Sequence, residues 1–338
     1  PAVYDAALPD SAPMTFGAAT SRSVYGAAPR NLSVAGNGEF VVYAARNGDS
    51  TSLWYRSLRD ARAHPIAGTL GAVSPSVSAD GSRVAFIIGD RSMVVPVAGG
   101  DPRTLSDGQM VTTQEWVSPT QVLLIDTDGN RANWLDSEGG TSRSKSIPRC
   151  VGGKWDPDAR RLVCSFNRTA LLVDPESGAR AVIHAVSPDG SPGGALEGTA
   201  FRVVDKTYLV YASPDGMLVA ARYDPGARLA QRPVMMLGGV RREAIGETQY
   251  DIAANGTLVY APGVDATLGR LVVMHPGSAP QPLLSELADY QRYDLSRNRR
   301  WFAAAVQATE GTELVVYDLQ NGQRSVWLRA EQVRHPIW

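Results

Sequence analysis

The chain has 338 residues, of which 43% are hydrophobic, and a formal net charge of -1. This balance provides no basic patch or stripe of the kind that nucleic-acid-binding proteins use, so we expect no nucleic-acid partner. No run of 18 apolar residues occurs, which excludes a transmembrane helix within this sequence.

The first thirty residues differ in composition from the rest. Residues 1–30 are rich in Pro, Ala, Ser and Gly and show no clean alternation. They predict an extended N-terminal arm that lies on the remaining domain and adds one outer strand near Met14 to Phe16. The sequence begins at Pro1 rather than Met, so we expect that a leader was removed or that a secretory signal or membrane anchor lies upstream.

The clearest structural pattern runs from Ser74 to Leu105. A turn signal at residues 78–81, Ser-Ala-Asp-Gly, separates two runs of strand-forming residues, and two more turns follow at Asp90 and at residues 99–102. The pattern predicts four antiparallel strands in about thirty residues, the size of one propeller blade. Such a sheet cannot bury both faces alone, so it predicts copies of itself.

Degenerate copies of this pattern recur along the chain. The first turn of each copy is followed by a strand-forming run, and the turns fall at Asn37, Asp80, Pro119, Asp158, Asp205, Asn255 and Asn298. Successive turns are 39 to 50 residues apart, the spacing of propeller blades. We therefore predict an all-β fold: a single β-propeller over residues 31–338, built of four-stranded antiparallel blades. Seven blades are expected, with six and eight as alternatives.

The two cysteines flank one of these turns. Cys150 and Cys164 are equidistant from Pro157, and residues equidistant from a hairpin turn face each other across the strands. The expected Cα separation suits a disulfide, which would indicate an oxidising compartment such as a periplasm. Two buried free thiols explain the same residues equally well, and both interpretations stay open.

No constellation of catalytic or metal-binding residues is recognisable. The four histidines lie in different predicted blades and none has a second ligand at metal-binding spacing: His64, His184, His275 and His335. The Asp-rich loop at 126–130 resembles a calcium site, but its Gly is misplaced and no bidentate Glu follows, so a hairpin turn is favoured. Phosphate-binding loops and the serine-hydrolase elbow are missing from the sequence. We expect no enzyme activity, catalytic residue, cofactor or metal.

Several stretches of the chain resemble one family of propellers. They are HPIAGTLGAVSPSVSADGSRVAFI with VVPVAGGDPRTL, GMLVAARYD with PVMMLGGV, and IAANGTLVYAPG with RLVVMHPGSAPQPL. These resemble the TolB-like, WD-repeat-like propeller attached to the membrane-spanning helix of many bacterial serine/threonine kinases, over nearly the whole chain from Asn31. The resemblance implies a non-catalytic module that senses or binds partners. No kinase motif occurs, so no kinase activity is implied.

Three functions are consistent with this reading. The first is a protein-interaction propeller, an extracytoplasmic accessory subunit or sensor module docked on a membrane protein complex. The second is a ligand-binding or lyase-type propeller, which predicts polar or charged side chains on the innermost strands around a central channel. The third is a structural protein of the cell envelope. We expect the first, in the periplasm or otherwise outside the cytoplasm, held at the membrane by a partner or an N-terminal anchor, with a cytoplasmic location as the alternative.

Overall fold

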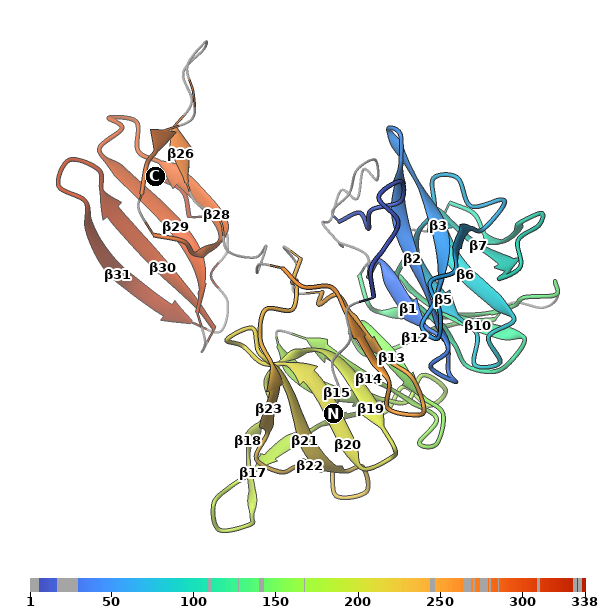
Figure 1. The fold of residues 1–338 in the computed structure, drawn as a ribbon. Coiled ribbons are helices and arrows are strands. Elements are labelled where there is room, and N and C mark those ends of the chain that lie inside the picture. Colours follow the sequence, from blue (N-terminus) through green and yellow to red (C-terminus); the bar gives the residue numbers. More distant parts are fainter. Residues whose placement is uncertain are drawn as a thin grey trace. The chain divides into compact units, whose positions relative to one another are not determined.

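The computed structural model describes most of the chain. The described residues are 6–16, 30–108, 111–126, 128–139, 143–166, 168–243, 247–263, 269, 271–273, 279, 281–284, 286–308, 311–330, 333 and 336–338. Within them the secondary structure consists of strands, turns and bends, without a helix (Figure 1). In this described part, no helix is therefore available to cross a membrane. The predicted all-β fold is confirmed.

The chain is divided into two compact units, Pro1–Val264 and Asp265–Trp338, each with most of its contacts inside the unit. The expected division, an arm over 1–30 and one propeller over 31–338, is not tested by this and stays a prediction.

Four sheets of the first unit are four-stranded, antiparallel and in sequential strand order. The first contains β1 (Leu32–Val34), β2 (Phe40–Asn47), β3 (Ser50–Ser57) and β4 (Ala63–Pro65). The second contains β5 (Val73–Val77), β6 (Arg83–Ile88), β7 (Arg91–Pro96) and β8 (Arg103–Ser106). The third contains β9 (Val111–Trp116), β10 (Gln121–Asp126), β11 (Arg131–Asp136) and β12 (Arg143–Ser146). The fourth contains β13 (Val151–Asp156), β14 (Arg161–Phe166), β15 (Thr169–Val173) and β16 (Arg180–Val182). These are the predicted blades one to four.

The fifth sheet is larger than predicted. Its blade consists of β19 (Thr199–Val204), β20 (Tyr208–Ala212), β21 (Leu218–Asp224) and β23 (Val234–Leu237). Three further strands extend it, namely β17 (His184–Val186), β18 (Pro192–Ala195) and β22 (Leu229–Ala230). Residues 187–191 connect β17 to β18, and the two strands pair as an antiparallel hairpin. The sixth sheet of the first unit has two strands, β24 (Tyr250–Ile252) and β25 (Leu258–Tyr260).

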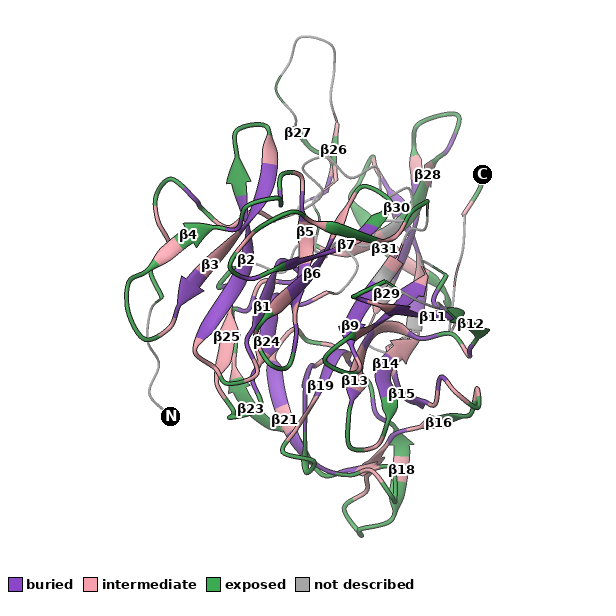
Figure 2. Cartoon of the chain, turned by 90° about the vertical axis from the view of Figure 1, so that its right-hand side faces the viewer, coloured by how far each residue is buried: buried purple, intermediate pink, exposed green. Residues whose placement is uncertain are grey.

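The six sheets of the first unit form a closed ring. Their innermost strands contact one another in the order β1, β5, β9, β13, β19 and β24, and β24 contacts β1. Backbone bonds support this closure, since the Ala254 amide donates to the Gly36 carbonyl at 3.0 Å. Apolar residues fill the space between successive blades, as with Val42 and Phe86 or Leu123 and Leu162. Figure 2 shows this burial along β2, whereas the outer strands β12 and β18 are exposed.

The second unit contains two sheets. The hairpin is formed by β26 (Val272–Val273) and β27 (Gln281–Pro282). The larger sheet is formed by β28 (Asp289–Leu295), β29 (Trp301–Ala308), β30 (Gly311–Asp318) and β31 (Gln323–Ala330). The latter is the predicted seventh repeat. Because the first unit closes a ring through six innermost strands, the expected count of seven blades is not confirmed.

Turn chemistry explains why these segments form hairpins. The Asp80 carboxylate accepts a hydrogen bond from the Ser82 amide at 3.0 Å, and Gly81 has φ of 74°. The Asp side chain stabilises the turn by accepting a hydrogen bond from the backbone amide two residues later. Gly adopts the left-handed conformation without a side-chain clash. The strand-forming residues on either side then pair as Val77 with Val84.

The N-terminal arm pairs with an inner part of the first blade. The Thr15 amide donates to the Ala44 carbonyl at 3.0 Å, and Met14 forms a bridge with Ala45 of β2. The expectation of an outer strand near Met14 to Phe16 was therefore wrong in position. The arm lies next to β2 because Ala12 and its apolar neighbours are buried against that strand.

Candidate functional site

Charged side chains converge inside the ring of the first unit. Four lie on innermost strands of different blades: Glu115 on β9, Lys154 on β13, Arg202 on β19 and Asp251 on β24. Arg30 directly precedes the first blade, and Glu247 precedes β24. We call these six residues the axial charge cluster. It contains three cations and three carboxylates, so its formal charges balance.

Asp251 is the hub of this cluster. Its Oδ1 atom lies 3.4 Å from Arg202 Nε and 3.5 Å from Arg30 Nη1. Lys154 Nζ lies 3.8 Å from the same oxygen. The other carboxylate oxygen, Oδ2, accepts hydrogen bonds from the Val34 amide at 3.1 Å and the Ser33 hydroxyl at 3.3 Å. Asp251 thus joins the sixth blade to the first, fourth and fifth.

Glu115 links the third blade to the same hub. Its carboxylate lies 2.9 Å from Lys154 Nζ and 3.5 Å from Arg30 Nη2. The hydroxyl of Ser33 extends the network to the second blade, because it accepts a hydrogen bond from the Val77 amide at 3.1 Å. Every blade of the ring is therefore tied to the cluster by polar contacts.

Irregularities in three innermost strands lie just before the residues that meet here. The strand registers shift between Val73 and Ser76, between Val151 and Lys154, and between Thr199 and Arg202. Each shift contains a residue in the left-handed region: Ser74 (φ 57°), Gly152 (φ 61°) and Ala200 (φ 55°). A β-bulge inserts one residue and re-aims the side chains that follow it. The bulges thus precede Lys154 and Arg202, which point into the cluster.

Attraction to the surrounding cations keeps the Asp251 carboxylate ionised. Burial alone would raise the pKa of Asp251, but the three cations around it, Arg30 foremost, outweigh burial and lower the pKa well below its usual range. Burial would lower the pKa of Arg30, but the carboxylates of Asp251 and Glu115 outweigh burial and raise it. Glu247 behaves differently, because burial raises its pKa and the opposing attraction of Arg202, 3.9 Å away, does not compensate.

These properties decide what the cluster can do chemically. A carboxylate that stays ionised and faces three cations is a poor base and a poor nucleophile, so Asp251 serves best as a structural anchor. The raised pKa of Glu247 makes its carboxyl easier to protonate than a carboxyl in water. Among the described residues, no group of three His, Cys, Asp or Glu side chains is arranged to hold a metal ion.

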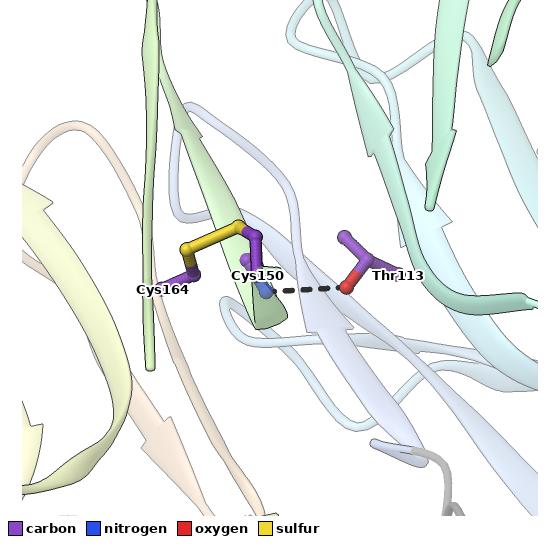
Figure 3. Close-up of a disulfide and its surroundings, with 4 residues drawn as sticks. Thr113, Cys150 and Cys164 are labelled. Atoms are coloured by element: carbon purple, nitrogen blue, oxygen red, sulfur yellow. Dashed lines mark hydrogen bonds between the residues drawn. A yellow bond between two sulfur atoms is a disulfide. The ribbon is translucent and has the colours of Figure 1, made fainter. Parts of the chain in front are cut away.

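The two cysteines of the fourth blade are joined by a disulfide (Figure 3). Their Cα atoms are 5.5 Å apart and both side chains are buried. They do not face each other as the hairpin symmetry suggested, because Asp156 pairs with Arg161, so the turn is centred between Asp158 and Ala159 rather than on Pro157. Gly153 provides the necessary space: a Cβ there would lie 3.2 Å from Cys150 Sγ. Its amide donates to Thr113 Oγ1 at 3.1 Å (Figure 3).

The other candidate residues of the sequence are not brought together. His64 stacks on Tyr55 at the exposed edge of the first blade, and the Nδ1 atom of His184 lies 3.1 Å from the Gly193 carbonyl. His275 and His335 lie outside the described residues. The loop at 126–130 is a hairpin turn, in which Asp126 accepts a hydrogen bond from the Asn130 amide at 2.9 Å.

The second unit carries an exposed aromatic surface. Trp327 of β31 is 64% exposed and Trp338 is 45% exposed, with their ring centroids 6.4 Å apart. Trp338 is held on β28, since its Nε1 donates to the Asp294 carbonyl at 3.2 Å and its amide donates to Oδ2 at 3.1 Å. Ile337 beside it is 84% exposed. We call these three residues the aromatic patch.

Sequence reasoning missed the axial charge cluster. A signal was present, because Glu115, Lys154 and Asp251 each lie four residues before the aligned turn of their repeat. A charge at the same place in three strands that should be buried indicates a shared polar environment. Arg202 is displaced by one position, and Arg30 and Glu247 lie outside the strands, so the full set could not be read from the alignment.

No protein-family model matches the chain, and no curated protein matches it significantly. Solved structures do match at low identity. A putative TolB from Agrobacterium tumefaciens is 13% identical, with a TM-score of 0.47 over 69% of this chain and 90% of that one. The β-propeller domain of Cps50 (Swd1) from Myceliophteria thermophila is 10% identical, with a TM-score of 0.44 over 90% of this chain and 86% of that one.

An enzyme is also among the similar structures. Dihydro-heme d1 dehydrogenase NirN is 15% identical with a TM-score of 0.42, and the match covers 88% of this chain. The chain spans only 65% of the length of NirN. The predicted likeness to TolB-like and WD-repeat-like propellers agrees with these neighbours, while the resemblance to kinase-attached propellers stays a prediction. All of these likenesses concern the fold, and function is argued from the chain's own residues.

Proposed function

We propose that the chain is a non-catalytic protein-interaction propeller, an accessory or sensor module docked on a membrane protein complex outside the cytoplasm. The observation that carries this proposal is the aromatic patch. Its three large apolar side chains are turned to solvent, whereas large apolar side chains such as Phe201 and Trp134 are buried between the blades of the first unit. Exposed apolar surface of this kind marks interaction sites, and Trp is enriched among the residues that dominate binding energy.

The axial charge cluster supports the same proposal. Its cations and carboxylates pair with one another and tie the blades together, which leaves the centre of the ring occupied by structural contacts. Recognition is then the task of surfaces away from the centre. A rigid scaffold suits this task because it holds exposed side chains in fixed positions.

The disulfide supports the proposed location. Disulfides persist in oxidising compartments and are rare where thiols are kept reduced. The link between Cys150 and Cys164 is therefore consistent with a periplasmic or other extracytoplasmic site. The resemblance to the propellers of membrane-anchored kinases leads to the same proposal.

Site-specific photocrosslinking in cells tests the docking. A photoreactive amino acid replaces Trp327 in the full chain, and the matched control replaces Gln323, which is also exposed on β31. We expect a discrete crosslinked protein at position 327 that is absent at position 323. Its identification as a membrane-complex subunit would support the proposal. Equal products at both positions, or none at position 327, would contradict it.

The alternative function, ligand binding in the central channel, is favoured by one observation. Charged side chains do lie on the innermost strands, and Lys154 and Glu247 are the most accessible of the cluster at 24% and 18% exposed. Thermal unfolding with inorganic phosphate, succinate or spermidine tests this function. A stabilisation that disappears in Lys154→Met or Glu247→Gln would favour it, and no shift with any probe would count against it.

A further inference from the structure

The outer strand of the fifth blade differs from those of its neighbours. The outer strands of the first four blades carry a basic, histidine or proline residue: His64 and Pro65 in β4, Arg103 in β8, Arg143 and Lys145 in β12, and Arg180 in β16. Such residues protect exposed strand edges from pairing with other chains. In contrast, β23 reads Val-Met-Met-Leu and carries no charge.

The apolar side chains of β23 face solvent. Val234 is 69% exposed, Met235 is 64% exposed and Met236 is 43% exposed. The strand pairs with β21 on one side, and no other strand in the described part of the chain pairs with it. An uncharged apolar strand with a free edge is a template for strand addition.

Charges flank β23 with opposite signs at its two ends. At the Val234 end, Arg232 is exposed, and so is Arg222, whose carbonyl accepts a hydrogen bond from the Gln231 amide at 2.8 Å. Asp224, which is also near this end, accepts a hydrogen bond from Ala227 within its own turn. At the Leu237 end, β23 pairs with Leu218, which follows the turn that contains the exposed Asp215.

We infer that β23 pairs antiparallel with β23 of a second copy of this chain, forming a two-fold symmetric dimer. A two-fold contact uses the same patch on both copies, so it must be self-complementary. Antiparallel pairing brings the Arg232 end of one strand next to the Asp215 end of the other, and the uncharged centre introduces no repulsion. This inference is independent of the partner proposed for the aromatic patch.

Sedimentation velocity over a concentration series tests the inference. The wild-type chain is expected to show reversible dimerisation, and Met235→Lys to remain monomeric because two lysines meet near the two-fold axis. Leu70→Lys is the matched control: Leu70 is 67% exposed in a turn outside the strands, so this variant is expected to dimerise like the wild type. Circular dichroism verifies that both variants are folded.

A charge exchange tests the orientation of the two strands. Arg232→Asp alone is expected to raise the dimer Kd by roughly tenfold, a loss of affinity comparable with that caused by removing one close charge pair. Adding Asp215→Arg in the same chain is expected to restore dimerisation.

A wild-type chain that stays monomeric at every concentration would overturn the inference, as would a dimer unaffected by Met235→Lys. A monomer that binds a different protein through β23 would also overturn it, because the occupant proposed here is a second copy.

Discussion

The two units differ in where they place their charged and aromatic side chains. The first unit buries charged residues at the centre of a ring of strands and joins its first and sixth blades through Asp251. The second unit builds its main sheet from long neighbouring strands and leaves Trp327 and Trp338 exposed. Ring closure and the proposed docking through the aromatic patch thus lie in different parts of the chain.

The largest effect is expected from removal of the hub. Asp251→Ala leaves Arg30 and Arg202 buried without their shared carboxylate, and breaking a buried ion pair typically costs about 3–5 kcal/mol. Hydrogen exchange of the full chain, followed by mass spectrometry, should show faster exchange in β1 and β24 and little change in β29 and β30.

The control for this variant is Asp60→Ala. Asp60 lies 2.8 Å from Arg62 on the surface, where the arginine lowers the pKa of this aspartate to about 2. Exposed ion pairs contribute little to stability, so the exchange pattern of this variant should match the wild type. Equal behaviour of the two variants would refute the role of Asp251 in closure.

A smaller loss is expected when the disulfide is removed. The cysteines are 14 residues apart, and a crosslink that closes a loop of this size stabilises a protein by about 3 kcal/mol in the chain-entropy model. In urea unfolding, the double variant Cys150→Ala, Cys164→Ala should be less stable than the oxidised wild type. Reductant should destabilise the wild type and leave the double variant unchanged; sensitivity of both would show that the effect lies elsewhere.

Glu247 provides a pH-dependent comparison. Its raised pKa means that the native state favours the protonated carboxyl more than the unfolded chain does. This contribution to stability is complete below the ordinary pKa of about 4.3 and is lost as the pH rises through the raised value. Glu247→Gln should therefore gain stability relative to the wild type as the pH rises through that interval. Unfolding free energies measured at several pH values check this sign, and a constant difference would contradict it.

The smallest effect concerns the bulge of the fifth blade. Ala200 has φ of 55°, a conformation that costs an ordinary residue about 1–2 kcal/mol and costs glycine far less. Ala200→Gly should stabilise the ring because it relieves this strain, and the larger entropy that glycine loses on folding limits the gain to about 1 kcal/mol at most. Ala220→Gly, in the regular strand β21, should instead destabilise it. Thermal unfolding of both variants checks the opposite signs.

Much of the architecture could be predicted from local chemistry. Turns with Asp-Gly, as at Asp80, restrict the chain within a few residues, and the strands on either side follow from β-branched and aromatic composition. For this reason the strands of the second blade match their predicted positions closely. The extra strands β17 and β22 were missed because they pair in parallel with each other across more than forty residues, and no local pattern records such a contact.

The site was less predictable for the same reason. The charge on Asp251 is visible in the sequence, but its role in closing the ring depends on contacts with Val34 and Arg30. These two residues come close to Asp251 only when the ring closes. The pairing of Cys150 was misjudged because the turn of this hairpin is centred between Asp158 and Ala159 and not on Pro157, as the pairing of Asp156 with Arg161 shows.

The long separation between Asp251 and its first-blade partner also bears on how the protein is made. The carboxylate and the Val34 amide are 217 residues apart, so a ribosome must add that many residues before the bond can form. At ordinary elongation rates this takes on the order of tens of seconds. Throughout that time the early blades of the nascent chain lack their closing neighbour.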